Sequence, residues 1–330
     1  MVDNDRAKKL SIITPVYNEA ANVSRCAQAC AEVMGSELSS YEYEHIFADN
    51  ASTDETLEIL RDLASKDSRI KVIANSRNVG ALRNIANAMR SATGDAVVPM
   101  LAADLQDPAE VIPKFVDEWE AGSLVVYGIR ANRNERLFLR AGRGLYYRIL
   151  AWSGGSTSAP PHAGEFQLLD RQVVDSVLSV DDQYPYIRGL VAQTGARNSS
   201  VKYDWVERKA GRSKANFPVL LDQAANGFVT TSRAPTRLAL LIGLIASIFG
   251  MGIGVFSLIF FAITRDGTAT GIPTLVVGVF VLGGLQLFFI GLIGEYVLSM
   301  HGQVRRTPPM FEIERINLES GGPAADLAGQ

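Results

Sequence analysis

Residues 96–108 read Ala-Val-Val-Pro-Met-Leu-Ala-Ala-Asp-Leu-Gln-Asp-Pro, an apolar run that ends abruptly in carboxylates and an amide. This pattern is typical of a buried parallel strand that delivers polar groups to the carboxyl edge of its sheet, where open α/β sheets bind ligands. Asp104 and Gln106 are separated by one residue, and in an extended segment side chains at such a spacing point the same way. The stretch therefore predicts a site with oxygen ligands, which suit Mg²⁺ or Mn²⁺.

Asp107 differs from Asp104 in its local context. It precedes Pro108, and Glu110 follows three residues later. That spacing is typical of a helix N-cap with proline at the first helical position. We therefore expect Asp107 to cap a helix, whereas Asp104 has no such structural explanation and is assigned to a ligand.

Apolar runs and helical periodicity alternate on both sides of this stretch. Expected strands cover residues 10–13, 43–48, 70–74, 96–101, 124–127 and 165–170, and expected helices cover residues 23–34, 52–63, 81–90, 109–120 and 186–194. Ser52 and Glu55 form a capping-box pattern at the start of the second helix. Strands that alternate with helices predict an α/β fold with a mostly parallel, doubly wound sheet.

Composition narrows the class of protein. The chain has 330 residues, is 47% hydrophobic and 20% charged, and has a formal net charge of −3. An acidic balance gives no indication of nucleic-acid binding. The two cysteines, Cys26 and Cys30, lie one helical turn apart, and we expect both to be small buried hydrophobic residues in a reducing compartment.

Two long uncharged apolar runs occupy the second half of the chain, residues 238–263 and 272–294. Each is long enough to cross a bilayer as a helix, and the arginines outside the two runs predict that both ends lie in the cytoplasm. An amphipathic pattern over residues 217–232 predicts either a helix at the membrane interface or a helix that packs on the preceding module.

These features predict four segments. They are an N-terminal α/β domain over residues 1–215, an interfacial helix over residues 216–235, a transmembrane hairpin over residues 236–300 with spans at about 238–263 and 272–297, and a partly disordered cytoplasmic tail over residues 301–330.

Five motifs in order resemble one protein family. They are Pro-Val-Tyr-Asn-Glu at 15–19, Asp-Asn-Ala-Ser-Thr-Asp at 49–54, Ala-Asp-Leu-Gln-Asp-Pro at 103–108, Arg-Gly-Leu at 188–190 and Glu-Arg-Lys-Ala-Gly-Arg-Ser-Lys at 207–214. The ordered set resembles the polyprenyl-phosphate glycosyltransferases of glycosyltransferase family 2, which include bactoprenol glucosyltransferases and dolichyl-phosphate mannose synthase.

The resemblance implies a GT-A, Rossmann-like fold and an inverting, metal-dependent reaction. A monosaccharide would pass from a nucleotide sugar, UDP-glucose or a related UDP- or GDP-sugar, to polyprenyl (undecaprenyl) phosphate. The product would donate sugar for modification of cell-envelope glycans. The implied setting is the bacterial inner membrane, with a multi-pass chain, a cytoplasmic catalytic domain and a homo-oligomeric assembly.

The same resemblance implies roles for particular residues. Asp104 and Glu165 would be catalytic, and Asp104 and Gln106 would hold Mg²⁺ or Mn²⁺. The nucleotide-sugar site would comprise Pro15, Tyr17, Glu19, Asp49, Asn50, Gly80, Ala103, Asp104 and Gln106. The acceptor phosphate would be bound by Arg130, Arg143, Arg208, Ser213 and Lys214.

Two departures from the family pattern leave alternatives open. Ala102 stands where the family usually has the first aspartate of Asp-x-Asp, and Gln167 stands where relatives tend to carry a positive charge. The alternatives are a non-catalytic membrane scaffold that binds sugar nucleotides, and a polysaccharide synthase. The short hairpin and the absence of a Gln-x-x-Arg-Trp sequence argue against the synthase.

Overall fold

The computed structural model describes residues 7–131, 160, 163–180, 182, 185–206, 271–304 and 310–318, and single positions between 242 and 263. The chain forms two compact units. Unit 1 combines Met1–Leu137, Thr157–Lys214 and Arg306–Gln330, and unit 2 combines Phe138–Ser156 and Ala215–Arg305. Unit 1 is therefore assembled from three separate stretches of sequence.

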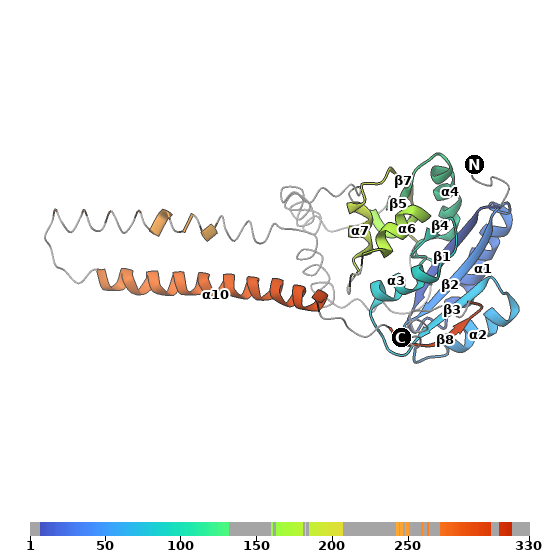
Figure 1. Ribbon diagram of the computed structural model, residues 1–330, viewed down its shortest axis with the longest axis horizontal. Helices are drawn as coiled ribbons and strands as arrows, with labels where there is room; N and C mark the ends of the chain where they lie inside the picture. The colour runs from blue at the N-terminus through green and yellow to red at the C-terminus, as the bar shows by residue number, and fades with distance from the viewer. Residues whose placement is uncertain are drawn as a thin grey trace, which may run out of the picture. The chain divides into compact units, whose positions relative to one another are not determined.

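Unit 1 is built on one eight-stranded sheet with the strand order β7-β5-β6-β4-β1-β2-β3-β8 (Figure 1). The strands are β1 (Lys9–Val16), β2 (Glu42–Asp49), β3 (Ile70–Asn75), β4 (Ala96–Val98), β5 (Val125–Arg130), β6 (Ala163–Asp170), β7 (Asn198–Tyr203) and β8 (Glu312–Ile316). The first six lie where apolar runs predict strands, because runs rich in Val and Ile fit a sheet that is covered on both faces.

The sheet is mixed, and less parallel than the sequence predicts. Strands β4, β1, β2 and β3 run parallel in the centre, and β5 runs parallel to β7. Strand β6 runs antiparallel to both of its neighbours, β4 and β5, and β8 runs antiparallel to β3. The central parallel strands still bring their carboxyl ends to one edge of the sheet.

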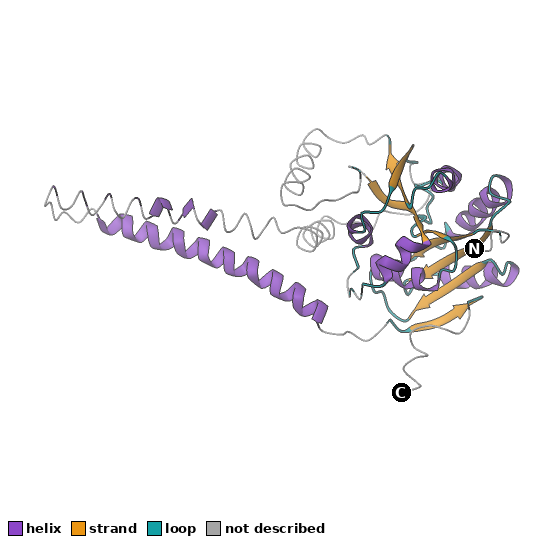
Figure 2. Ribbon diagram, turned by 45° about the horizontal axis from the view of Figure 1, so that its top comes forward, coloured by secondary structure: helices purple, strands orange, loops and turns teal. Residues whose placement is uncertain are grey.

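Helices cover both faces of this sheet (Figure 2). One face packs against α1 (Val23–Ser36), α2 (Thr56–Lys66), η1 (Ala109–Val111) and α4 (Ile112–Glu120). The other packs against α3 (Ala81–Ser91), α6 (Arg171–Leu178) and α7 (Ile187–Gln193). Cys26 and Cys30 of α1 are unbridged and buried in the first core, which confirms their expected packing role.

Strand β8 was not predicted from the sequence. Its first neighbour, Phe311, accepts a hydrogen bond at its carbonyl oxygen from the Ser76 amide at 2.9 Å. The Glu314 carboxylate pairs with Arg61 of α2 at 2.6 Å. The Asn317 amide donates to the backbone carbonyl oxygens of Ala64 and Ile70 at 2.8 and 2.9 Å. The segment expected to be a tail therefore completes the sheet.

Helix α10 (Gly271–Val304) is the long helix of unit 2 and contains the second expected membrane span. A search of the described residues nevertheless finds no helix that is both long and apolar enough to cross a membrane. This finding contradicts the expected multi-pass inner-membrane location, and it leaves the expected transmembrane hairpin over 236–300 unconfirmed. The sequence argument counted apolar residues, whereas a hairpin needs two continuous helices of about 20 residues each. The expected interfacial helix at 216–235 lies outside the described residues.

Candidate active site

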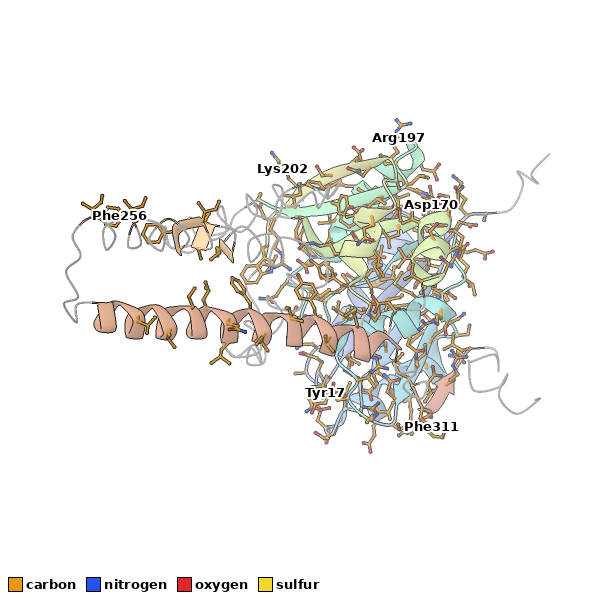
Figure 3. All side chains as sticks on the ribbon, turned by 60° about the vertical axis from the view of Figure 1, so that its left-hand side comes forward. Tyr17, Asp170, Arg197, Lys202, Phe256 and Phe311 are labelled. Atoms are coloured by element: carbon orange, nitrogen blue, oxygen red, sulfur yellow. The ribbon has the colours of Figure 1, made fainter. Side chains whose placement is uncertain are left out.

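The carboxyl edge of the central strands gathers the first group of predicted site residues. Pro15 lies in β1 opposite Ala48 of β2, and Val16 lies opposite Asp49. Tyr17 follows β1 at the protein surface, on the side of unit 1 away from Arg197 and Lys202 (Figure 3). The parallel register therefore brings the segments after β1 and β2 side by side, as a nucleotide site at this edge requires.

Hydrogen bonds fix the segment after β1 to the segment after β2. The Asn18 amide nitrogen donates to Ser52 Oγ at 2.9 Å, and the Thr53 amide nitrogen donates to Asn18 Oδ1 at 2.7 Å. Asn18 has a φ of 53°, a left-handed conformation that Asn tolerates better than most residues. Glu19 receives a 2.6 Å bond at Oε2 from the side chain of Asn22, the residue that caps α1. Glu19 is thus not the cap itself.

Asp49 ends β2 and is 1% exposed. Its carboxylate accepts hydrogen bonds from the Ser52 amide, at 3.1 Å, and from the Ser52 hydroxyl. Burial raises the pKa of Asp49, and these bonds oppose the rise. The capping box predicted for Ser52 and Glu55 is therefore wrong, because Ser52 bonds Asp49 and α2 has Glu55 as its N-cap.

Asn50 connects the ends of β2 and β3. Its Nδ2 donates to Asn78 Oδ1 at 2.9 Å, and its Oδ1 accepts from the Val79 amide at 2.9 Å. Asn78 Oδ1 also accepts from the Gly80 amide at 3.0 Å. Gly80 caps α3 with a φ of +86°, which residues with a side chain rarely adopt. The two predicted site residues Asn50 and Gly80 therefore belong to one hydrogen-bonded network.

The Asp104–Gln106 segment is a turn rather than an extended strand. Strand β4 ends at Val98, and Leu105 has a φ of 55°. The Leu105 amide donates to the Ala102 carbonyl oxygen at 2.9 Å, and the Gln106 amide donates to Asp104 Oδ1 at 3.1 Å. The side chains at 104 and 106 therefore do not project together as an extended segment would require. Asp104 is partly buried and remains at the carboxyl edge of the sheet.

Asp107 does not cap a helix, so its sequence interpretation is wrong. Pro108 caps η1 and Val111 caps α4, neither with a side-chain bond. Asp107 is 2% exposed and accepts bonds from Arg130, at 3.0 and 3.1 Å, and from the Tyr203 hydroxyl at 2.5 Å. These partners are distant in sequence, which is why the local pattern could not predict them.

Arg130 is the acceptor-phosphate candidate within the described residues. Its guanidinium group lies 5.6 Å from the ring centre of Trp205, in addition to its bonds with Asp107. The Val206 amide donates to the Gln106 carbonyl oxygen at 3.1 Å, so the segment after β7 also contacts this turn. Asp107 and Arg130 therefore support the turn that carries Asp104. The other acceptor-phosphate candidates, Arg143, Arg208, Ser213 and Lys214, lie outside the described residues.

Glu165 lies at the start of β6, beyond the point where β4 ends. Strand β6 pairs with β4 only through Leu169 and Asp170, so Glu165 extends toward the same carboxyl edge. Burial raises the pKa of Glu165, and the guanidinium group of Arg188 in α7 opposes the rise. Arg188 was part of a quoted motif but received no role from the sequence. Its effect on Glu165 adds it to the candidate site.

The described residues do not form a metal centre by themselves. No group of three or more His, Cys, Asp and Glu side chains in the described ranges is placed to hold a metal ion. Asp104 supplies one carboxylate, and Ala102 supplies no ligand in the position before the turn. A cation at this edge therefore needs most of its ligands from elsewhere.

Comparison with known proteins identifies the family. The family model described as Glycosyl transferase family 2 matches residues 11–178. The chain is 34% identical to the uncharacterized glycosyltransferase YkcC of Bacillus subtilis (strain 168), over 90% of this chain and 91% of the relative. It is 30% identical to the prophage bactoprenol glucosyl transferase homolog of Escherichia coli (strain K12), over 93% and 99%. It is 31% identical to the SfII prophage-derived bactoprenol glucosyl transferase of Shigella flexneri, over 91% and 96%.

The chain therefore belongs to glycosyltransferase family 2, and its fold is a GT-A, Rossmann-like mixed sheet with helices on both faces. Among solved structures, the mannosyltransferase PcManGT from Pyrobaculum calidifontis in complex with GDP-Man and Mn²⁺ aligns with a TM-score of 0.45 and 18% identity, over 76% of this chain and 81% of that one. A likeness of this size supports no functional conclusion.

Proposed function

We propose that this protein transfers a monosaccharide from a nucleotide sugar, UDP-glucose or a related UDP- or GDP-sugar, to polyprenyl phosphate with inversion. The observation that carries the proposal is the common edge at which Asp49, Asn50 and Asp104 follow parallel strands. Two relatives named bactoprenol glucosyl transferase, or a homolog of it, align over more than 90% of this chain, which supports a lipid phosphate as the acceptor.

The nucleotide is assigned to the segments after β1, β2 and β3. Tyr17 offers a ring for the base, and the carboxylates of Glu19 and Asp49 accept hydrogen bonds from base or ribose. The network of Asn50 and Gly80 holds this surface in place before the donor binds. Pro15 and Ala103 are assigned to the same nucleotide surface. This preorganisation reduces the ordering cost of binding.

The diphosphate is assigned to the turn that contains Asp104. A divalent cation, Mg²⁺ or Mn²⁺, fits the single carboxylate of Asp104, because Mg²⁺ commonly binds through one or two carboxylates with substrate phosphates and water. When bound, the cation would stabilise the charge that develops on the leaving diphosphate. Asp104 would hold the cation at the carboxyl edge of β4.

The transfer step needs a nucleophile and a leaving group on opposite faces of the sugar. An oxygen of the acceptor phosphate forms a bond to the anomeric carbon as the bond from that carbon to the diphosphate oxygen breaks. The nucleoside diphosphate then leaves, and the configuration inverts. A phosphate monoester has a second pKa of about 6, so the acceptor is already largely ionised at neutral pH.

Glu165 and Arg130 have separate roles in this scheme. Because the acceptor needs little deprotonation, we assign Glu165 to orienting donor or acceptor groups. Arg130 contributes positive charge where two anions must approach, and Asp107 holds its side chain in position. Arg143, Arg208, Ser213 and Lys214 are further candidates for the acceptor phosphate on the basis of their motifs.

The test is a transfer assay with the purified full chain. Detergent-dispersed undecaprenyl phosphate and a panel of radiolabelled UDP- and GDP-sugars are incubated with Mg²⁺, Mn²⁺ or a chelator. We expect one sugar to label an organic-extractable, acid-labile lipid, and the chelator to reduce the labelling. No labelled lipid with any donor would refute the proposal. Donor binding without turnover would favour a scaffold, and a product ladder would favour a polysaccharide synthase.

A further inference from the structure

One buried side chain at the edge of the candidate active site lacks the partners that its chemistry needs. Gln167 of β6 is 0% exposed, and neither its amide nitrogen nor its amide oxygen has a hydrogen-bond partner. Among the described residues it is the only side chain in which both polar atoms are buried without a partner. Such a group gives up its water without compensation and therefore lowers stability.

The position of Gln167 relates it to Glu165. Glu165 and Gln167 lie two residues apart on β6, beside a register shift in the pairing of β5 with β6. Arg188 of α7 acts on Glu165 and also on Tyr127, which places Glu165 and the cross-strand partner of Gln167 near the same helix. The direct cross-strand partner of Gln167 is Tyr127 of β5. Leu169 and Tyr127 belong to the core that α7 covers, so this is the α7 face of the sheet.

Few charges act on this face. Arg188 of α7 is the titratable group of the described elements that acts on Glu165, Tyr127 of β5 lies opposite Gln167, and β4 contributes no titratable group. Burial raises the pKa of Tyr127 to about 12, so this side chain is neutral near pH 7. Arg188 acts on both Tyr127 and Glu165. Gln167 is therefore a neutral hydrogen-bonding group close in sequence to a carboxylate on which one cation of the described residues, Arg188, acts.

We propose that Gln167 is a positioning residue for Glu165, whose carboxylate accepts a hydrogen bond from the Gln167 amide nitrogen when the donor sugar occupies the site. This deepens the proposed function and rests on it. An N–H donor favours the ionised form of a carboxylate, so this bond opposes the effect of burial on Glu165. The unpaired amide in the structure is the cost of holding that donor ready.

The test compares three variants of the full chain. Gln167→Met has a similar volume without the polar atoms, and Gln167→Glu keeps the shape and adds a like charge. Ser199→Ala is the matched control, because Ser199 Oγ is also buried without a partner. Ser199 pairs with Val126 of β5, whose side chain lies in the opposite core. Thermal unfolding, kcat and KM against pH, and the carboxyl carbon signal of Glu165 by NMR are measured for each.

We expect Gln167→Met to raise the unfolding temperature, because two unpaired polar atoms are removed. Its kcat should fall about tenfold or more from misorientation of Glu165, with a smaller change in KM. The acid limb of the pH–rate profile and the NMR titration of Glu165 in the presence of donor should both move to higher pH. Gln167→Glu should move them further. Ser199→Ala should change neither the acid limb of the pH–rate profile nor the NMR titration of Glu165.

A lower unfolding temperature in Gln167→Met would overturn the proposal, since it would mean that the amide has partners. An unchanged Glu165 titration would overturn it as well. If the wild-type protein transfers no sugar to lipid, the proposed function fails, but the unfolding and NMR measurements still decide whether Gln167 acts on Glu165.

Discussion

Strand β2 carries two buried carboxylates whose partners differ in charge. Glu44 lies near its amino end and Asp49 at its carboxyl end, and each is 1% exposed. Glu44 forms ion pairs with Lys71 at 2.5 Å and Lys9 at 3.0 Å. Asp49 accepts its hydrogen bonds from Ser52, which is neutral.

The pKa values show the consequence. Burial raises the pKa of Glu44, but hydrogen bonds from Lys71, Ser11, Thr93 and Lys9 outweigh it and bring the value to about 2. Burial raises the pKa of Asp49, and the hydrogen bonds from Ser52 oppose the rise without reversing it. The amino edge of the sheet thus pairs the ionised Glu44 with two lysines, whereas Asp49 at the carboxyl edge accepts its side-chain hydrogen bonds from a neutral group.

Among the substitutions that test this comparison, we expect the largest effect, a loss of kcat, at Asp104. Asp104→Ala removes a charge from the carboxyl edge and should lower kcat by about 10²–10³-fold, or about 2.7–4 kcal/mol of transition-state stabilisation, with little change in stability. Asp117→Ala on the exposed face of α4 is the matched control. Transfer assays and urea unfolding measure both. A large stability loss in Asp104→Ala would mean that Asp104, like Glu44, stabilises the fold and does not serve a ligand.

Glu44→Gln should have the opposite profile. Removal of one partner of a buried ion pair should cost about 3 kcal/mol of unfolding free energy, because Lys71 and Lys9 are only 16% and 18% exposed. The folded protein should bind donor normally. Asp62→Asn breaks the exposed pair with Lys66 and should cost less than about 0.5 kcal/mol.

The pH dependence of stability sharpens this second prediction. A carboxylate with a lowered folded-state pKa stabilises the protein above its unfolded pKa, and the contribution is lost as the pH falls through the folded value. For Glu44 that window runs from the ordinary 4.5 down to about 2. Urea midpoints measured across this window should fall in the wild-type protein and fall less in Glu44→Gln. Parallel curves would contradict the assignment.

Asp107→Asn tests a carboxylate at the carboxyl edge that, like Glu44, forms an ion pair within the protein. It leaves Arg130 without its ion pair and weakens the acceptor of the Tyr203 hydroxyl, so we expect a loss of about 2 kcal/mol of unfolding free energy. A helix cap would have cost about 1 kcal/mol. Urea unfolding decides between these values.

Asp49→Asn is expected to give the smallest effect, and it acts on binding. A raised carboxyl pKa means that the folded state favours the protonated form, so this group's contribution to stability is lost as the pH rises through the raised value. The neutral variant should be as stable as the wild type at pH 7. Its donor KM should rise about tenfold for one lost charged hydrogen bond, or about 1.4 kcal/mol. Calorimetric titration with the nucleoside diphosphate checks this, and an unchanged affinity would refute the ribose assignment.

Local patterns predicted the elements that are locally determined. The apolar runs of β1 to β5 correctly predicted these strands, because a strand that is covered on both faces is a nearly continuous run of apolar residues. Helix α6 was missed because it follows β6 directly, with Asp170 as its cap. Strand β8 was missed because Glu-Ile-Glu-Arg-Ile is a short, mostly polar segment whose partner β3 lies far away in sequence.

The candidate site shows the same limit. Asp49, Asn50 and Asp104 were predicted because strand ends in a parallel sheet meet at one edge. The role of Asp107 was not predictable, since it depends on Arg130 and Tyr203, which are remote in sequence. The orientation of Asp104 and Gln106 also failed, because the left-handed Leu105 turns the chain where an extended strand was assumed.

The return of the chain at β8 has a consequence for synthesis of the protein. Because β8 follows α10, the ribosome completes unit 2 before it makes the last strand of unit 1. Until then β3 is an edge strand whose unpaired backbone groups can pair with another chain. A nascent or truncated chain that stops before residue 310 therefore exposes an aggregation-prone edge at β3, and β8 acts as the protecting strand of the finished protein.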